Sequence, residues 1–119
     1  MDAIRTMLAR VRAPGFPNDH FPGLLHLLIG KTLVDLDGNV VSRGYSWREC
    51  ASMLKTARID PELARTLDLN PDDLPPRDRE KFWYVALTRF PVASERAKAC
   101  ADALVPWMAK AGIKVAQGS

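Results

Sequence analysis

In several segments of the chain, apolar residues recur every three or four positions, the spacing that places them on one face of an α-helix. Capping residues, prolines and glycines bound these segments, which predicts helices over about residues 3–12, 22–29, 47–58, 61–69, 77–89 and 95–111. For residues 24–29 a strand is the alternative, because a short apolar run fits both structures. Pro106 should kink the last helix or divide it in two.

Between the second and third predicted helices, the pattern changes to two short β-prone runs, residues 32–36 and 40–42. The Asp-Gly-Asn sequence of residues 37–39 separates them, and this combination is typical of a β-hairpin. Residues 113–115 are expected to add a third strand beside the hairpin. After the hairpin, Ser46 and Glu49 have the spacing of a capping box, so a helix should begin at Trp47.

The apolar faces of the helices should meet in one interior, because a chain of 119 residues is about the size of one domain. We expect the core to include Met7, Leu8, Leu25, Leu28, Trp47, Leu54, Phe82, Leu87, Leu104 and Trp107. The sequence therefore predicts a mainly α, compact single domain over residues 1–119, with five to six helices and a small β-hairpin near residues 32–43.

The composition, 47% hydrophobic and 26% charged, is typical of an ordinary globular protein. The longest apolar run, residues 24–29, is far shorter than the roughly 20 residues of a membrane-spanning helix. The N-terminal segment lacks the pattern of a secretory signal. Cys50 and Cys100 each lie on the apolar side of a predicted helix, where a cysteine is usually a small buried hydrophobe. We therefore expect a cytoplasmic protein without membrane contact.

Two short motifs resemble ligand-binding loops, but their contexts argue against both. The Gly-Lys-Thr of residues 30–32 would end a phosphate-binding loop only if a glycine stood at position 25, where Leu25 is found. The acidic residues of 35–39 would begin a calcium loop only if its sixth position, Val40, were glycine. The sequence therefore predicts no metal and no cofactor.

Asp19, His20 and His26 are the residues best suited to metal or acid-base chemistry. A spacing of six does not place the two histidines on one helix face, so only a loop could bring them together. Neither Cys50 nor Cys100 lies in a motif that activates a thiol nucleophile. A small metal-dependent or hydrolytic enzyme around His20 and His26 is thus the third of three hypotheses, and the sequence favours a protein that is not an enzyme.

The net charge of +3 arises in the first half of the chain, where residues 1–59 contain eight Lys or Arg and five Asp or Glu. Basic side chains bind phosphates and aromatic rings stack on bases, which suggests a nucleic-acid surface formed by Arg43, Tyr45, Arg48, Lys55 and Arg58. Arg5 and Arg12 are possible additions to it. We expect Tyr45 to be the exposed aromatic residue of this surface, because Trp47 is in register with apolar core positions.

A helix-turn-helix over residues 47–69 is disfavoured, because its second helix would present mainly acidic residues to DNA. The absence of a catalytic motif ranks a non-catalytic interaction or accessory protein first, with an unknown protein partner or self-association. Weak and largely non-specific nucleic-acid binding is the alternative.

Overall fold

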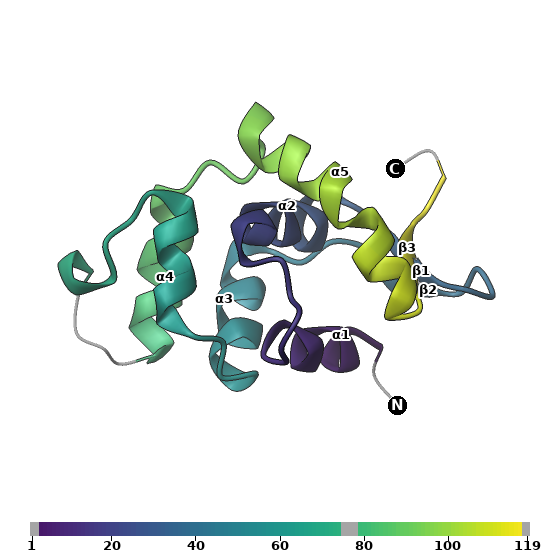
Figure 1. Ribbon diagram of the computed structural model, residues 1–119, viewed down its shortest axis with the longest axis horizontal. Coiled ribbons are helices and arrows are strands. Elements are labelled where there is room, and N and C mark those ends of the chain that lie inside the picture. Colours follow the sequence, from purple (N-terminus) through teal and green to yellow (C-terminus); the bar gives the residue numbers. More distant parts are fainter. Residues whose placement is uncertain (1–2, 75–78, 118–119) are drawn as a thin grey trace.

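The chain forms five α-helices, three short 3₁₀ segments and one small sheet in the part that the computed structural model describes, residues 3–74 and 79–117 (Figure 1). The α-helices are α1 (Ala3–Val11), α2 (Phe21–Gly30), α3 (Trp47–Thr56), α4 (Arg79–Arg89) and α5 (Glu95–Lys110). The 3₁₀ segments are η1 (Asn18–His20), η2 (Pro61–Leu67) and η3 (Pro71–Asp73). The strands are β1 (Leu33–Asp35), β2 (Val40–Ser42) and β3 (Ile113–Val115). The predicted mainly α fold is confirmed.

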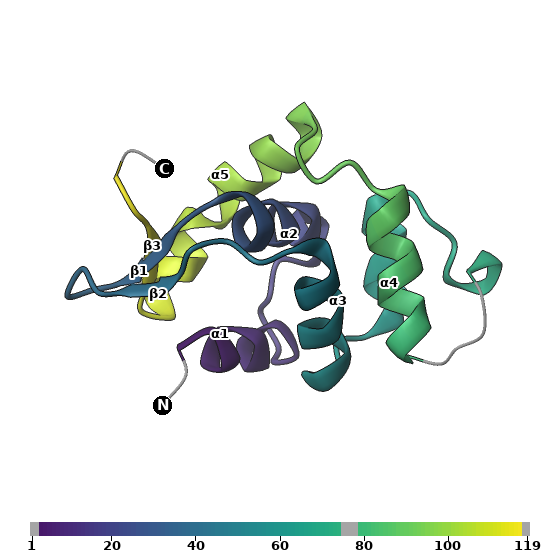
Figure 2. The same cartoon turned by 180° about the vertical axis from the view of Figure 1, so that it is seen from behind.

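Helix α2 lies at the centre of the molecule, with α5 on one side and α1 on the other (Figures 1 and 2). Helices α2 and α5 pack together extensively, and α3 packs against α4. Seven of the ten residues of α2 are buried, which explains why its leucines do not form a single stripe. The closest approach occurs at Gly23, where a Cβ atom would lie 2.2 Å from the backbone nitrogen of Ala101.

The sheet has the order β2-β1-β3, with both pairs antiparallel, so the predicted hairpin and third strand are confirmed. Asp35 closes the turn, because its Oδ1 atom accepts hydrogen bonds from the backbone N–H groups of Asp37 and Asn39. Gly38 has φ +88°, a conformation that glycine adopts without steric cost. The sheet lies at the C-terminal end of α5, on the opposite side of the molecule from α4 (Figure 1).

The predicted starts of the helices are better matched than their ends. Ser46 and Glu49 form the complete capping box, and Asp60 caps the next segment through the N–H of Glu62. That segment is η2, a 3₁₀ helix shorter than the predicted helix over 61–69. Helix α5 is not divided at Pro106, which lies inside it. Both Pro106 and Asp102, whose carbonyl loses its helical hydrogen-bond partner, are exposed residues. The predicted cap at residue 2 and helix start at residue 77 lie outside the described residues.

The core confirms most of the predicted residues, with Trp47 as the exception. The buried ones are Met7, Leu8, Leu25, Leu28, Leu54, Phe82, Leu87 and Leu104. Both Trp47 and Trp107 are only half-buried. Trp107 packs against the core from its edge, whereas Trp47 is not part of it, so the assignment of Trp47 to the core is wrong. Trp83 is the fully buried tryptophan instead, with its ring centroid 5.6 Å from that of Phe21. Trp47 is the first residue of α3, and its ring contacts that of Tyr84 in α4.

Candidate functional site

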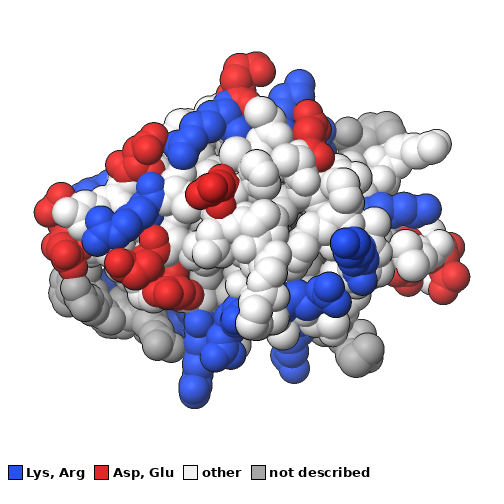
Figure 3. Space-filling view, in the orientation of Figure 1, with Lys and Arg blue, Asp and Glu red and all other residues white. Residues whose placement is uncertain are grey.

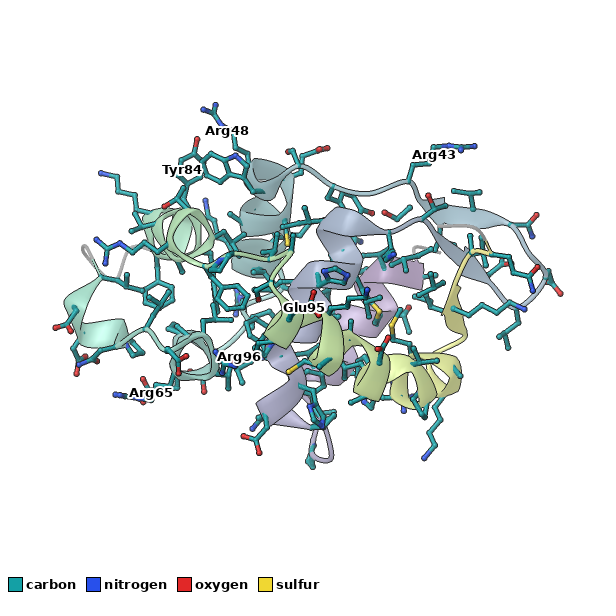
Figure 4. All side chains as sticks on the ribbon, turned by 90° about the horizontal axis from the view of Figure 1, so that it is seen from above. Arg43, Arg48, Arg65, Tyr84, Glu95 and Arg96 are labelled. Atoms are coloured by element: carbon teal, nitrogen blue, oxygen red, sulfur yellow. The ribbon has the colours of Figure 1, made fainter. Side chains whose placement is uncertain are left out.

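Trp47, Arg48 and Tyr84 form a stack of side chains on the surface where α3 meets α4. The Trp47 and Tyr84 ring centroids are 4.6 Å apart in an edge-to-face arrangement. The Arg48 guanidinium carbon lies 5.3 Å from the centroid of Trp47 and 5.7 Å from that of Tyr84. Figure 4 shows Arg48 and Tyr84 together at one edge of the molecule. Cation–π contact of this kind orients the guanidinium without using its hydrogen-bond donors.

An open apolar hollow of about 640 Å³ adjoins this stack. We call it the Trp47 hollow; it is lined by Ile29, Ser46, Trp47, Leu87, Thr88 and residues 90–93. None of these lining residues is charged, and the basic residues Arg48 and Arg89 directly follow lining residues in the chain. An apolar concavity beside the Arg48 guanidinium suits a ligand that is itself apolar and carries a carboxylate.

Local interactions hold the walls of the Trp47 hollow in place. The Ser46 hydroxyl accepts from the N–H of Glu49, and the Glu49 carboxylate accepts from the N–H of Ser46, which fixes the start of α3. The backbone N–H of Ser46 and then its hydroxyl lower the pKa of Glu49 by stabilising the carboxylate. His26 Nδ1 lies 2.8 Å from the carbonyl oxygen of Val92. A carbonyl can only accept, so this nitrogen carries the proton and ties the α4–α5 linker to α2.

The sequence-predicted nucleic-acid residues lie on several parts of the molecule. Arg43 is exposed after β2 and lies far from Arg48, although both project from the same side in Figure 4. Arg58 lies beyond the C-terminus of α3, whereas Arg48 is in its first turn, so about 12 Å of helix lies between them. Lys55 is half-buried. Tyr45 is also half-buried and packs against the core, so its prediction as the exposed aromatic residue is wrong.

Tyr84, with 37% of its surface exposed, is the aromatic residue that the sequence reasoning missed. It lies among the aromatic and apolar residues 82–87, so the local sequence does not show that its ring is exposed. Its pairing with Trp47 joins residues 37 positions apart, for which the sequence carries no local signal.

A second surface emerges where α1 runs beside the C-terminal half of α3. We call it the basic underside; it comprises Arg5, Arg12 and Arg58, all exposed. Arg5 lines a groove with Thr56 and Ala57, and Arg12 lines a cavity with Arg58. Residues 3–18 and 50–59 contain no Asp or Glu. In Figure 3 the described residues along the lower edge, over α1 and the end of α3, include blue side chains and no red ones. The sequence had indicated Arg5 and Arg12 only as possible additions, because their proximity to α3 depends on the tertiary fold.

The histidines do not form a joint site. His26 is engaged with the α4–α5 linker, and His20 Nδ1 is buried without a hydrogen-bond partner in the described structure. The Cys100 thiol lies 3.8 Å from the carbonyl oxygen of Asp19. Burial raises the pKa of the Cys50 thiol to about 12. Among residues 3–74 and 79–117, no three His, Cys, Asp or Glu side chains are grouped as a metal site.

None of the described helices combines the length and the apolar character needed to cross a membrane. Comparison of the chain with protein-family models, with curated proteins and with solved structures finds no match. The function of each candidate site is therefore argued from the chemistry of its own residues.

Proposed function

We propose that this chain is a non-catalytic interaction protein that binds a segment of a partner protein in the Trp47 hollow. The segment would carry a large apolar side chain beside a carboxylate. The observation that carries the proposal is the half-buried Trp47, which borders an uncharged hollow and has the Arg48 guanidinium over its ring.

The chemistry of the partner follows from that of the hollow. Its lining is apolar apart from two hydroxyl groups, so an apolar side chain gains free energy on leaving water there. Tryptophan and arginine are the residues that most often dominate binding energy at protein interfaces. Arg48 is already oriented by Trp47 and Tyr84, so a carboxylate can pair with it at a reduced entropic cost.

A peptide selection tests this proposal. A displayed library of random 12-residue peptides is selected against the parent protein, with the Trp47→Ala variant used to remove peptides that bind elsewhere. We expect enrichment of an aromatic or large aliphatic residue beside Asp or Glu. In fluorescence anisotropy, an enriched peptide should bind Trp47→Ala and Arg48→Ala at least about tenfold more weakly. Arg5→Ala, which removes the same charge from the basic underside, should bind within about twofold of the parent.

Two results would contradict the proposal. One is a selection that yields no peptide preferring the parent protein over Trp47→Ala. The other is self-association: size-exclusion chromatography with light scattering would show a dimer that Trp47→Ala converts to a monomer. That outcome would assign the hollow to a second copy of this chain.

The basic underside favours a second candidate function, weak and largely sequence-independent binding of RNA or DNA. Arg5 lies in α1, and Arg12 and Arg58 lie just beyond the C-terminal ends of α1 and α3; Asp60 is the acidic residue that lines a cavity with the latter two. Binding of a labelled single-stranded oligonucleotide should weaken steeply as salt increases, because counterions compete for the phosphates. Reversal of two charges in Arg5→Glu/Arg12→Glu should weaken binding more than the matched reversal Arg43→Glu/Arg48→Glu. Equal losses in both variants, or no binding at low salt, would exclude this surface.

A further inference from the structure

A cavity of about 530 Å³ opens where the end of α1, the following connector and the α3–η2 junction meet. Arg12 and Asn18 line it from the connector that follows α1. Arg58 and Asp60 line it from the α3–η2 junction. Val11, Pro14 and Leu63 supply apolar wall. The cavity thus combines charged donors with an apolar surface, as binding sites for small organic ligands do.

Two arginines from separate segments, Arg12 and Arg58, line this cavity. The structure shows no ion pair of Arg12 or Arg58 with another described residue. Asp60 is the acidic residue of the described lining, and its Oδ1 atom already accepts a hydrogen bond from the N–H of Glu62 at 2.9 Å. The formal charge of the lining is therefore +1, with several N–H donors available to an anion.

Arg58 occupies an unusual backbone position for an arginine. Its φ is +56°, and it follows the C-terminus of α3 at the point where the N–H of Ile59 donates to the carbonyl of Leu54. Glycine is the usual residue there, because a side chain in the left-handed region is sterically strained. An arginine at this position places a long cationic side chain beside the cavity, and its left-handed backbone costs some stability.

We propose that this cavity binds a phosphomonoester. The phosphate would lie between the Arg12 and Arg58 guanidinium groups, which match its geometry through paired N–H donors. The Asn18 amide could donate further, and the organic part of the ligand would pack on Val11, Pro14 and Leu63. The cavity is much larger than a phosphate ion, so an organic phosphate fits better than the inorganic ion. The site is separate from the Trp47 hollow and does not depend on that proposal.

Isothermal titration calorimetry at constant ionic strength tests the site, with phenyl phosphate, inorganic phosphate and phenol as probes. Phenyl phosphate should bind more tightly than inorganic phosphate, and phenol should not bind. Arg12→Gln and Arg58→Gly should each weaken the binding of phenyl phosphate at least about tenfold. Arg10→Gln is the matched control, because it removes a charge from α1 outside the cavity, and it should bind within about twofold of the parent. Thermal unfolding of each variant verifies that it is folded.

The phosphate group could belong to a small metabolite or to the end of a nucleic acid, and two further probes separate these sources. An oligonucleotide with a 5′-phosphate that binds more tightly than phenyl phosphate, and loses this advantage in Arg58→Gly, would support the nucleic-acid end. Weaker binding of that oligonucleotide than of phenyl phosphate would support a small ligand. Equal binding of the 5′-phosphate and 5′-hydroxyl oligonucleotides would exclude the nucleic-acid end as the ligand. An Arg10→Gln loss as large as that of Arg12→Gln would overturn the phosphomonoester site. Failure of phenyl phosphate to bind at millimolar concentration would also overturn it.

Discussion

Gly23 and Ala101 bring the backbones of α2 and α5 into direct contact, since a Cβ atom on Gly23 would lie 2.2 Å from the Ala101 nitrogen. The nearest atoms all belong to the backbone, so no side chain can rotate to make room. The two helices could accommodate a methyl group here only by moving apart.

Gly23→Ala should therefore lower the free energy of unfolding by about 2–3 kcal/mol, because overpacking outweighs the better helix propensity of alanine. Gly30→Ala is the control in the same helix, since its Cβ would come no closer than 4.0 Å to His26 Cε1. That variant should be unchanged or more stable by up to about 1 kcal/mol. Urea unfolding measures both, and equal effects would contradict the close packing at Gly23.

Trp47 and Trp83 should respond differently to truncation, because Trp83 is fully buried and Trp47 borders an open hollow. Trp83→Ala should cost about 3–5 kcal/mol of stability through lost burial and a cavity. Trp47→Ala should cost about 1–2 kcal/mol, since it loses mainly the contact with Tyr84. Urea unfolding followed by circular dichroism compares them. Similar costs would mean that Trp47 is a core residue after all.

These tryptophans show how far the sequence predicts the fold. The capping box of Ser46 and Glu49 depends on residues three apart, so the sequence contains all of it and the prediction is confirmed. The burial of a tryptophan depends on which elements pack over it, and helical periodicity cannot supply that information. For the same reason the candidate surfaces were foreseen only in fragments: the Trp47–Tyr84 pair and the basic underside each join segments that are distant in sequence.

Stability at acidic pH should depend on Glu49. Its pKa is lowered in the folded protein from an ordinary value of 4.5, because the carboxylate accepts hydrogen bonds at the start of α3. This stabilisation is present above pH 4.5 and is lost as the pH falls through the folded pKa. Glu49→Gln should therefore lose less stability than the parent between about pH 5 and pH 3.

Glu95→Gln provides the control for that experiment, because Glu95 lies in the first turn of α5 without a recorded hydrogen bond to its side chain in the described structure. The Glu95→Gln variant should lose as much stability as the parent protein when the pH is lowered from about 5 to 3. Asp35 has a pKa lowered mainly by the N–H of Asn39, so part of the acid sensitivity remains in every variant. Urea midpoints measured across this pH range would reveal the difference, and parallel curves for the parent and Glu49→Gln would contradict it.

The two cysteines should react at very different rates with a thiol-specific reagent such as dithionitrobenzoate. Burial raises the pKa of Cys50 from 9.0 to about 12, which reduces its thiolate population about 1,000-fold at pH 8. Cys100 is half-buried and should react first. In Cys100→Ser the fast phase should disappear, and the remaining thiol should react only as the protein unfolds. Two fast thiols in the parent would show that the packing around Cys50 opens readily.

The sheet and the Trp47 hollow lie toward different ends of the molecule, and the described chain both begins and ends on the sheet side (Figure 1). A tether attached beyond either end would therefore hold the protein by the sheet side. On a sensor surface or a bead, this leaves the hollow directed toward the solution. Immobilisation through the chain ends is thus the orientation best suited to capturing a partner there.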